Sequence, residues 1–214
     1  MEPGTQAQAA GPPPAAPGSD RETNGLRCRT WTLLATLLRS PPDARALDAL
    51  AALESGGAAP LEDALTVAWI ALRDAARSAD PDALDDEFHD LFIGIGRGEL
   101  VPYGSWYRTG FLMDRPLVNL RRDLHTLGFQ RQTETHEPED NAAALAEVMA
   151  MLADPDTGQD EPTQQLFFYE HVDPWMPTLF ADMQSAKTAD FYVAVGRLGA
   201  AFLDFERAWL QASN

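Results

Sequence analysis

Apolar residues recur along this chain three and four positions apart, which is the spacing of amphipathic helices. Residues 25–40 form the first such pattern, which stops before Pro41 and Pro42 because proline cannot continue a helix. A second helix is predicted from 42–43 to the Gly56-Gly57 pair, and a third over 61–77 with one apolar stripe. Asp80-Pro81 supplies an N-cap and a first-turn proline for a fourth helix.

The second half of the chain repeats this behaviour after a glycine-rich break. Helical patterns are predicted over 105–128 and 138–153, and over 163–185 with a break near Pro174 and Pro177. The last helix carries apolar residues spaced 4, 3, 4, 3 and 4 apart: Phe191, Val195, Leu198, Phe202, Phe205 and Trp209. This spacing is typical of a buried seam in a helical bundle.

No segment alternates convincingly between apolar and polar residues, and no internal repeat is present. The glycine-rich stretch 93–104, IGIGRGELVPYG, lacks the Gly-Lys-Ser/Thr of a phosphate loop and follows no strand, so it is predicted to be a plain loop. The pattern therefore predicts an all-α, single-domain helical bundle of about eight to ten helices with a glycine-rich central loop. Residues 1–22, rich in Pro, Ala and Gly, are expected to form a disordered tail before a helical domain over 23–214.

Charge narrows the range of partners. The net charge is −17, and residues 80–90 and 131–175 contribute −6 and −10 of it. Nucleic acid and anionic membrane surfaces would be repelled by such a protein, so neither is an expected partner. Solvated helix ends kept acidic for solubility would explain the same segments equally well.

Cysteine content and hydropathy indicate the cellular compartment in which the protein is expected. The single cysteine excludes an internal disulfide and a cysteine-based metal cluster. The first twenty residues lack the basic and apolar regions of a secretory signal, and no apolar run approaches the roughly eighteen residues of a membrane span. A soluble, cytoplasmic protein without membrane insertion is expected.

The stretch 135–148, THEPEDNAAALAEV, contains the acidic turn, which we define as Glu137, Pro138, Glu139, Asp140 and Asn141. Proline in the first turn and acids near a helix N-terminus have an ordinary structural explanation. A second explanation is a small metal-dependent hydrolase built from His136, Glu137, Asp140 and His171. No His-Glu-x-x-His pattern supports it, and Ser105 lacks the Gly-x-Ser-x-Gly context of a nucleophile. We therefore predict no catalytic residue, no metal site and no cofactor.

Four motifs in a fixed order resemble those of a known family. Phe88-x-x-Leu91-Phe92, then VPYGSWY over 101–107, then EPEDN over 137–141, and finally FFYEHVDPW over 167–175 are similar to the cytoplasmic chaperones of exported molybdoenzymes, the TorD/DmsD/NarJ group. Together the motifs span residues 84–180. The helices on either side fit this group in length and kind.

The resemblance implies an all-helical, non-enzymatic chaperone. It implies binding of an apo-molybdoenzyme catalytic subunit, usually through its twin-arginine leader peptide, so that cofactor insertion precedes export. The residues that match the family's peptide groove are Tyr103, Gly104, Ser105, Tyr107, Glu137, Pro138 and Asp140. His171 and Trp175 match a helix motif whose implied role is structural. Asn141 stands where the family has His, so a role that needs a titratable imidazole is in doubt here.

The residues themselves suggest how such a peptide could bind. Two guanidinium groups followed by an apolar run require carboxylates beside an apolar trough. Glu137 and Asp140 would provide the first, and the rings of Phe92, Tyr103, Trp106 and Tyr107 the second. This hypothesis requires both sets of residues to form one cleft. A generic acidic helical adaptor remains the other alternative, and the identity of the client and a homodimeric state are left open.

Overall fold

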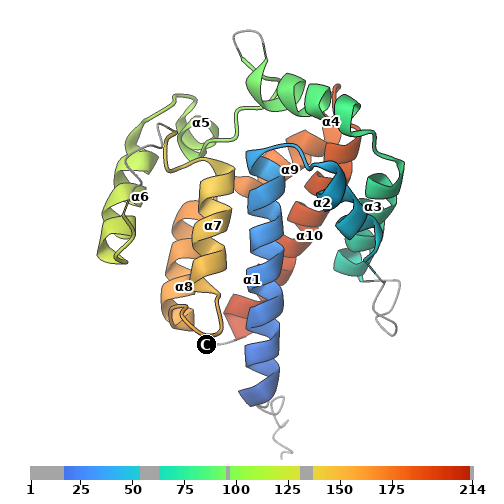
Figure 1. Ribbon diagram of the computed structural model, residues 1–214. Coiled ribbons are helices and arrows are strands. Elements are labelled where there is room, and N and C mark those ends of the chain that lie inside the picture. Colours follow the sequence, from blue (N-terminus) through green and yellow to red (C-terminus); the bar gives the residue numbers. More distant parts are fainter. Residues whose placement is uncertain (1–16, 54–62, 95–96, 131–136, 213–214) are drawn as a thin grey trace, which may run out of the picture.

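The computed structural model describes residues 17–53, 63–94, 97–130 and 137–212. These residues form ten α-helices and two π-helical turns, and they contain no β-strand (Figure 1). The predicted all-α bundle and its number of helices are therefore confirmed. Within the described residues, no helix has the length and apolar character needed to cross a membrane.

The helices follow one another with short connections. In chain order the elements are α1 (Pro17–Arg39), α2 (Ala44–Ala51), α3 (Ala64–Ser78), α4 (Pro81–Phe88), η1 (His89–Ile93), α5 (Gly104–Thr109), α6 (Arg115–Thr126), α7 (Ala142–Leu152), α8 (Glu161–Phe167), η2 (Phe168–Val172), α9 (Met176–Ser185) and α10 (Phe191–Ala212). Here η denotes a π-helical turn. Six helices begin with an Asp or Asn whose side chain accepts a hydrogen bond from a backbone N–H of the first turn: Asp43, Asp63, Asp80, Asp114, Asn141 and Asp160. Such caps satisfy amide groups that the helix itself leaves unpaired.

Two predicted boundaries need correction. The first helix begins at Pro17, so residues 17–22, which were assigned to the tail, belong to α1. Arg21 donates to the carbonyl of Pro155 at 3.1 Å and pairs with Asp156, so this end of α1 is held by a distant loop. Residues 1–16 lie outside the described residues, as do the predicted helix ends at 56–57 and 61.

The second correction concerns the helix predicted over 105–128, which is two helices. Gly110 ends α5 in a left-handed conformation with φ of 79°, and Asp114 caps a new helix, α6. The break predicted near Pro174 and Pro177 is confirmed, because η2 ends at Val172 and α9 starts at Met176.

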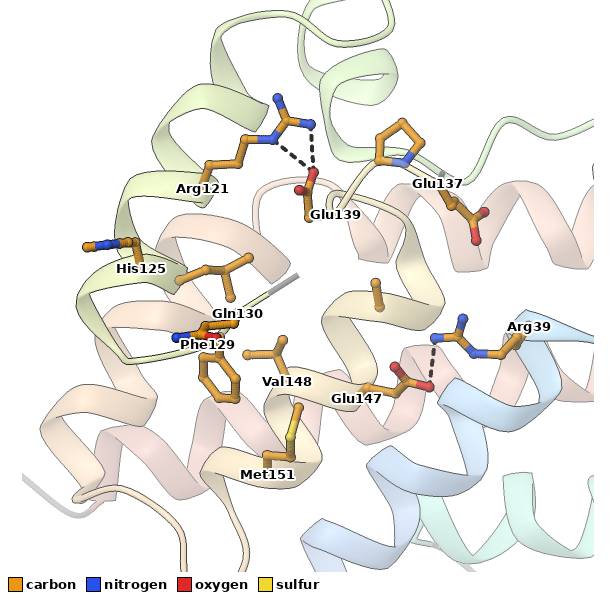
Figure 2. A pocket seen from close by; sticks show the side chains of 13 residues that line it. Arg39, Arg121, His125, Phe129, Gln130, Glu137, Glu139, Glu147, Val148 and Met151 are labelled. Carbon is orange, nitrogen blue, oxygen red and sulfur yellow. Dashed lines mark hydrogen bonds and ion pairs between the residues drawn. The ribbon is translucent and has the colours of Figure 1, made fainter. Parts of the chain in front are cut away.

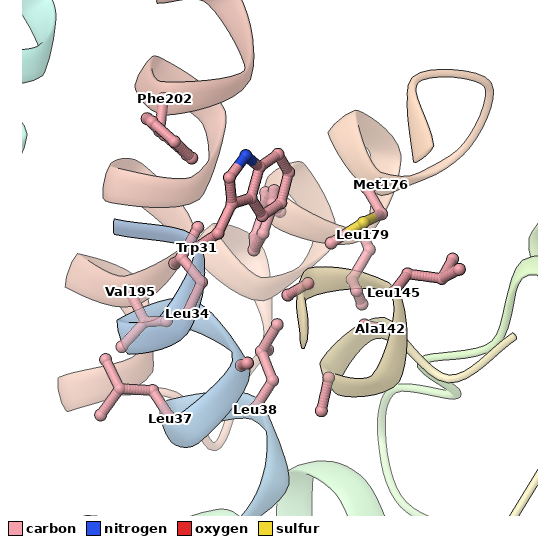
Figure 3. Close-up of a cluster of buried hydrophobic side chains, with 14 of the residues drawn as sticks. Trp31, Leu34, Leu37, Leu38, Ala142, Leu145, Met176, Leu179, Val195 and Phe202 are labelled. Atoms are coloured by element: carbon pink, nitrogen blue, oxygen red, sulfur yellow. The ribbon is translucent and has the colours of Figure 1, made fainter. Parts of the chain in front are cut away.

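The centre of the bundle is built from α1, α7, α9 and α10 (Figures 1 and 3). Trp31 of α1 is fully buried, and its ring meets Phe202 of α10 edge-on at 5.0 Å. The predicted α10 seam is buried from Phe191 to Phe202, and Phe205 and Trp209 are half-buried. A single apolar core therefore continues across these helices.

A buried ion pair crosses this core. Arg27 of α1 donates from Nε and Nη2 to the two carboxylate oxygens of Glu206 in α10, at 2.6 and 2.9 Å, and both residues are fully buried. Its Nη1 donates to Gln164 of α8 at 2.8 Å and to Asn24 at 2.6 Å. The guanidinium group also lies 5.9 Å from the Trp209 ring. The network joins three helices through charged groups that are shielded from water.

Candidate functional site

The structure places the acidic turn directly beside the VPYGSWY motif. Tyr103 and Asn141 form an antiparallel bridge. The N–H of Gly104 donates to the carbonyl of Asp140 at 2.8 Å, and the N–H of Ala142 donates to Pro102 at 2.9 Å. The two motifs therefore form one unit at the start of α5 and α7, although they are more than thirty residues apart in the chain.

Asp140 holds this unit together from the inside. Its side chain is 3% exposed, and Oδ2 accepts a hydrogen bond from the N–H of Ser105 at 2.7 Å. Oδ1 is buried and has no hydrogen-bond partner within the described part of the chain. In this position the carboxylate secures the first turn of α5. It does not face solvent, although binding a peptide directly would require it to do so.

Glu137, Tyr103 and Asn141 form the outer part of the unit. The Tyr103 hydroxyl and the Asn141 amide both donate to Oε1 of Glu137, at 3.0 and 2.8 Å. Asn141 also caps α7, because its Oδ1 accepts from the N–H of Ala143 at 2.8 Å. Burial, followed by the neighbouring Glu137 charge, raises the pKa of Tyr103 to about 12. Asn141 thus supplies a donor and an acceptor at once without a titratable ring.

Gly104 and Ser105 are required by close packing. A Cβ on Gly104 would lie 3.0 Å from Nε1 of Trp175, which donates to the carbonyl of His171 at 2.7 Å. Ser105 is fully buried, and its Oγ accepts from the N–H of Met113 at 3.1 Å. Both residues therefore fix backbone positions around α5.

The remaining predicted aromatic residues point to different places. Tyr107 lies 5.6 Å from the Trp175 ring and donates its hydroxyl to Asp182, and Trp106 lies under the guanidinium group of Arg97. Phe92 packs on Phe88 and on Tyr192 of α10. The three rings thus have different partners, and of the four predicted rings Tyr103 is the one with a hydrogen bond to the acidic turn in the described residues.

The acidic turn instead borders a cleft between α6, α7 and the end of α1, with a volume of about 890 Å³ (Figure 2). We call it the α6–α7 cleft. Its charged and polar lining consists of Arg39, Arg121, His125, Gln130, Glu137, Glu139 and Glu147; its apolar lining consists of Leu124, Phe129, Pro138, Ala144, Val148 and Met151. Phe92, Trp106 and Tyr107 do not line it.

Two ion pairs span the cleft wall. Arg39 pairs with Glu147 at 2.6 Å, and Arg121 pairs with Glu139 at 2.8 Å (Figure 2). The side chains of both arginines are more than 40% exposed. Ion pairs this exposed contribute only about 0–1 kcal/mol, so an incoming cation could exchange for either arginine at small cost.

Sequence reasoning missed most of this lining. Arg39, Arg121, Phe129 and Met151 lie in segments that carry no family motif. One signal was available in the sequence: residues 142–152, AAALAEVMAML, are apolar on nearly every face of the helix, and the structure leaves Met151 of this helix 48% exposed. A helix that is apolar all round is expected to be covered, so an exposed apolar residue on it marks a surface that a ligand or partner could occupy.

His171 and Trp175, for which the resemblance implies a structural role, both bind neighbouring parts of the fold. Nε2 of His171 donates to Oδ2 of Asp123 on α6 at 2.9 Å, and the imidazole also contacts the Phe167 ring. Burial lowers the pKa of His171 despite the nearby Asp123 and Glu170 carboxylates, with Arg108 adding to the depression. Hydrogen bonding from Arg122 is the main cause of the lowered pKa of Asp123.

This geometry predicts how stability depends on pH. Because the folded state disfavours protonated His171, the unfolded chain binds the proton more readily, and stability should fall as pH drops below about 6.5. The slope from this one group cannot exceed about 1.4 kcal/mol per pH unit. Urea unfolding of wild type and His171→Gln between pH 5 and 7.5 measures it. An equal slope in both proteins would assign the effect to other groups.

Of the residues proposed for a metal-dependent hydrolase, Asp140 and His171 line one small cavity, but Glu137 does not. Among the described residues, no group of three or more His, Cys, Asp or Glu side chains could hold a metal ion. Asp140 accepts a hydrogen bond from Ser105, His171 binds Asp123, and Glu137 binds Tyr103 and Asn141. Among the described residues these side chains thus have other partners. His136, the fourth member of the set, lies outside the described residues.

Comparison with known proteins places these features in context. The model of the family described as nitrate reductase delta subunit matches residues 58–181, more than half of the chain. The chaperone protein TorD of Vibrio cholerae is 28% identical over 131 residues, which cover 56% of this chain and 59% of that protein. The Tat proofreading chaperone DmsD of Salmonella typhi is 30% identical over 119 residues, covering 55% and 57% respectively. The chain thus aligns with under two thirds of the length of these relatives.

The fold is also found in a solved structure. A protein of Archaeoglobus fulgidus, described as a redox enzyme maturation protein, superposes with a TM-score of 0.51. The match covers 84% of this chain and 94% of that one at 19% identity. At this level of identity, the likeness concerns the arrangement of helices.

Proposed function

Since the chain belongs to the nitrate reductase delta subunit family, we propose that it is a chaperone of an apo-molybdoenzyme catalytic subunit, whose twin-arginine leader peptide it binds in the α6–α7 cleft. Its similar relatives TorD and DmsD are named chaperones. Such a chaperone performs no chemistry on its client. It would occupy the leader until the cofactor is inserted and thereby delay export.

The cleft is the observation that carries this proposal. It combines three carboxylates, Glu137, Glu139 and Glu147, with an apolar floor that includes Phe129 and Met151. A twin-arginine leader presents the complementary sequence of two guanidinium groups and an apolar run. Burial of the apolar run would contribute about 25 cal/mol per Å² before the cost of association, and the carboxylates would fix its direction.

The arginines that now pair with these carboxylates give the proposal a specific form. Arg39 and Arg121 occupy the positions that leader arginines would take opposite Glu147 and Glu139. The leader would replace one guanidinium group by another, so the ion pairs are exchanged and not lost. Electrostatic binding of this kind weakens as salt screens the charges.

The double variant Glu139→Gln/Glu147→Gln should weaken binding of a synthetic twin-arginine leader peptide by about tenfold or more, because two charge-assisted contacts are lost. Isothermal titration calorimetry at low and high salt measures the change. Asp182→Asn is the matched control, since this carboxylate lies outside the cleft.

Unchanged affinity of the double variant would remove the α6–α7 cleft from the proposed function. If the affinity for the peptide changes neither with salt concentration nor when the two arginines of the peptide are replaced by alanine, a generic adaptor would be favoured. Loss of binding in Asp182→Asn to the same extent would show that total charge, and not the cleft, is responsible.

A further inference from the structure

An exposed apolar turn joins α5 to α6. Phe111, Leu112 and Met113 are 71%, 47% and 67% exposed, and Val118 in the first turns of α6 is 63% exposed. We call Phe111, Leu112 and Met113 the apolar turn. Three consecutive large apolar side chains in water are costly, and a contiguous patch of this kind marks an interaction surface more often than single exposed residues do.

Hydrogen bonds to side chains of α5 fix the backbone of the apolar turn. Met113 has φ of 58°, and it is the one non-glycine residue with positive φ in the described part of the chain. Its N–H donates to Oγ of the buried Ser105, and the N–H of Phe111 donates to Oγ1 of Thr109 at 3.3 Å. An unfavourable conformation of a bulky residue persists only where surrounding contacts enforce it. The turn is therefore presented in a defined shape.

A local explanation covers only part of the patch. Met113 and Val118 stand at the N′ and N4 positions around the Asp114 cap, the positions of a hydrophobic staple. Such a staple accounts for these two side chains. The staple does not explain why Phe111 and Leu112, two large apolar side chains, are exposed.

We propose that the apolar turn of one molecule docks in the α6–α7 cleft of a second copy of this chain. The side chains of the apolar turn lack apolar neighbours, and the cleft would provide them from residues that include Leu124, Phe129 and Met151. Its volume of about 890 Å³ is sufficient for side chains the size of Phe and Met.

Charge complementarity favours a second copy as the occupant. Residues 97–130 hold five Arg and three acids, a net charge of 5 − 3 = +2 in a chain of −17. Exposed Arg115 follows the apolar turn directly, and the cleft carries Glu137, Glu139 and Glu147. The positive charge near the apolar turn therefore complements the negative charge of the cleft, which belongs to the acidic segment 131–175.

The placement of the two features permits a reciprocal contact. Val118, Arg121 and His125 share one face of α6 at spacings of three and four residues, and the last two line the cleft. The apolar turn thus lies at one end of this face and the cleft at the other. A two-fold axis across the middle of α6 would bring each turn into the partner's cleft, as an isologous dimer requires. Two such contacts bury twice the area of one, which brings a small patch closer to the size of a specific interface.

Sedimentation velocity of the full chain over a concentration series tests the proposal. Wild type should pass from monomer to dimer, and Phe111→Ser/Met113→Ser should raise the dissociation constant about tenfold or more. Met151→Arg, which places a cation on the cleft surface, should do the same. Leu166→Ser is the matched control, because Leu166 is 74% exposed on α8 and does not line the cleft, and it should leave dimerisation unchanged.

Mixing the two defective proteins makes the test specific. Phe111→Ser/Met113→Ser keeps its cleft and Met151→Arg keeps its turn, so the mixture should form a heterodimer through one of the two contacts. Wild type that stays monomeric to the highest concentration, or a turn variant that dimerises like wild type, would overturn the proposal. A turn variant that loses only binding to a client protein would assign the surface to the client and overturn it too.

A consequence for the client rests on the proposed function. If the leader occupies the same cleft, adding leader peptide should convert dimer to monomer in the same sedimentation experiment. If dimerisation depends on the apolar turn but is unaffected by the peptide, the proposed dimer stands. The α6–α7 cleft is then not the site of the leader.

Discussion

Replacing Glu206 by alanine is expected to lower the free energy of unfolding by about 3–5 kcal/mol, because the Arg27 guanidinium group would remain buried without its carboxylate. That is a large share of the roughly 5–15 kcal/mol that holds a domain of ordinary stability together. Gln164, Asn24 and the Trp209 ring would still contact Arg27, but none of them carries a compensating charge. Urea unfolding followed by circular dichroism measures the loss.

A pair of controls separates the charge from the packing. Arg27→Met/Glu206→Leu removes both charges and keeps similar volume, so its stability should be near that of wild type or above it. Glu147→Ala breaks the exposed pair with Arg39 and should cost less than about 1 kcal/mol. A cost this small for Glu206→Ala would mean that water reaches the buried pair.

Asp140→Ala is expected to destabilise the protein by about 1–3 kcal/mol, because the N–H of Ser105 would be left buried without an acceptor. The sequence-based hypothesis had instead treated Asp140, with Glu137, as a carboxylate that contacts the peptide. In the structure Asp140 is 3% exposed and belongs to the joint between the two motifs. Any loss of leader binding should therefore accompany the loss of stability.

Thermal unfolding and leader-peptide titration of the same samples distinguish the two roles. Asp140→Asn keeps an acceptor for Ser105 and should recover most of the stability. Glu139→Ala, in the same turn but on the cleft surface, should bind leader less tightly at nearly unchanged stability. Full stability of Asp140→Ala together with lost binding would make Asp140 a direct ligand contact.

The periodicity of apolar residues was sufficient to predict most of the helices, because each helix buries one face in a common core. The α10 seam from Phe191 to Phe202 is an example: its spacing alone predicted its burial. The split between α5 and α6 escaped prediction because Gly110 and Asp114 interrupt a stretch whose helical residues continue on both sides. Tertiary contacts of Arg21 extended α1 beyond the point where composition suggested order.

The site was harder to predict than the fold, for a geometric reason. Trp106 and Tyr107 are neighbours in the motif, yet adjacent residues of a helix point about 100° apart, so one faces Arg97 and the other Trp175. A motif records which residues occur together in the chain and not which of them face a shared space. Glu137 and Pro138 line the cleft as well as matching the motif, whereas Arg39 and Met151 join them only through folding.

The π-helical turn η2 also sets the rotational phase of everything that follows it. A π turn accommodates one residue more than an α turn, so the same residues wound as an uninterrupted α-helix would be out of phase after this point. His171 and Trp175 would then be rotated by about 100° relative to the residues before Phe168. The contacts to Asp123 and to Gly104 would be lost together. The π turn is therefore what directs both side chains toward their partners on α6 and α5.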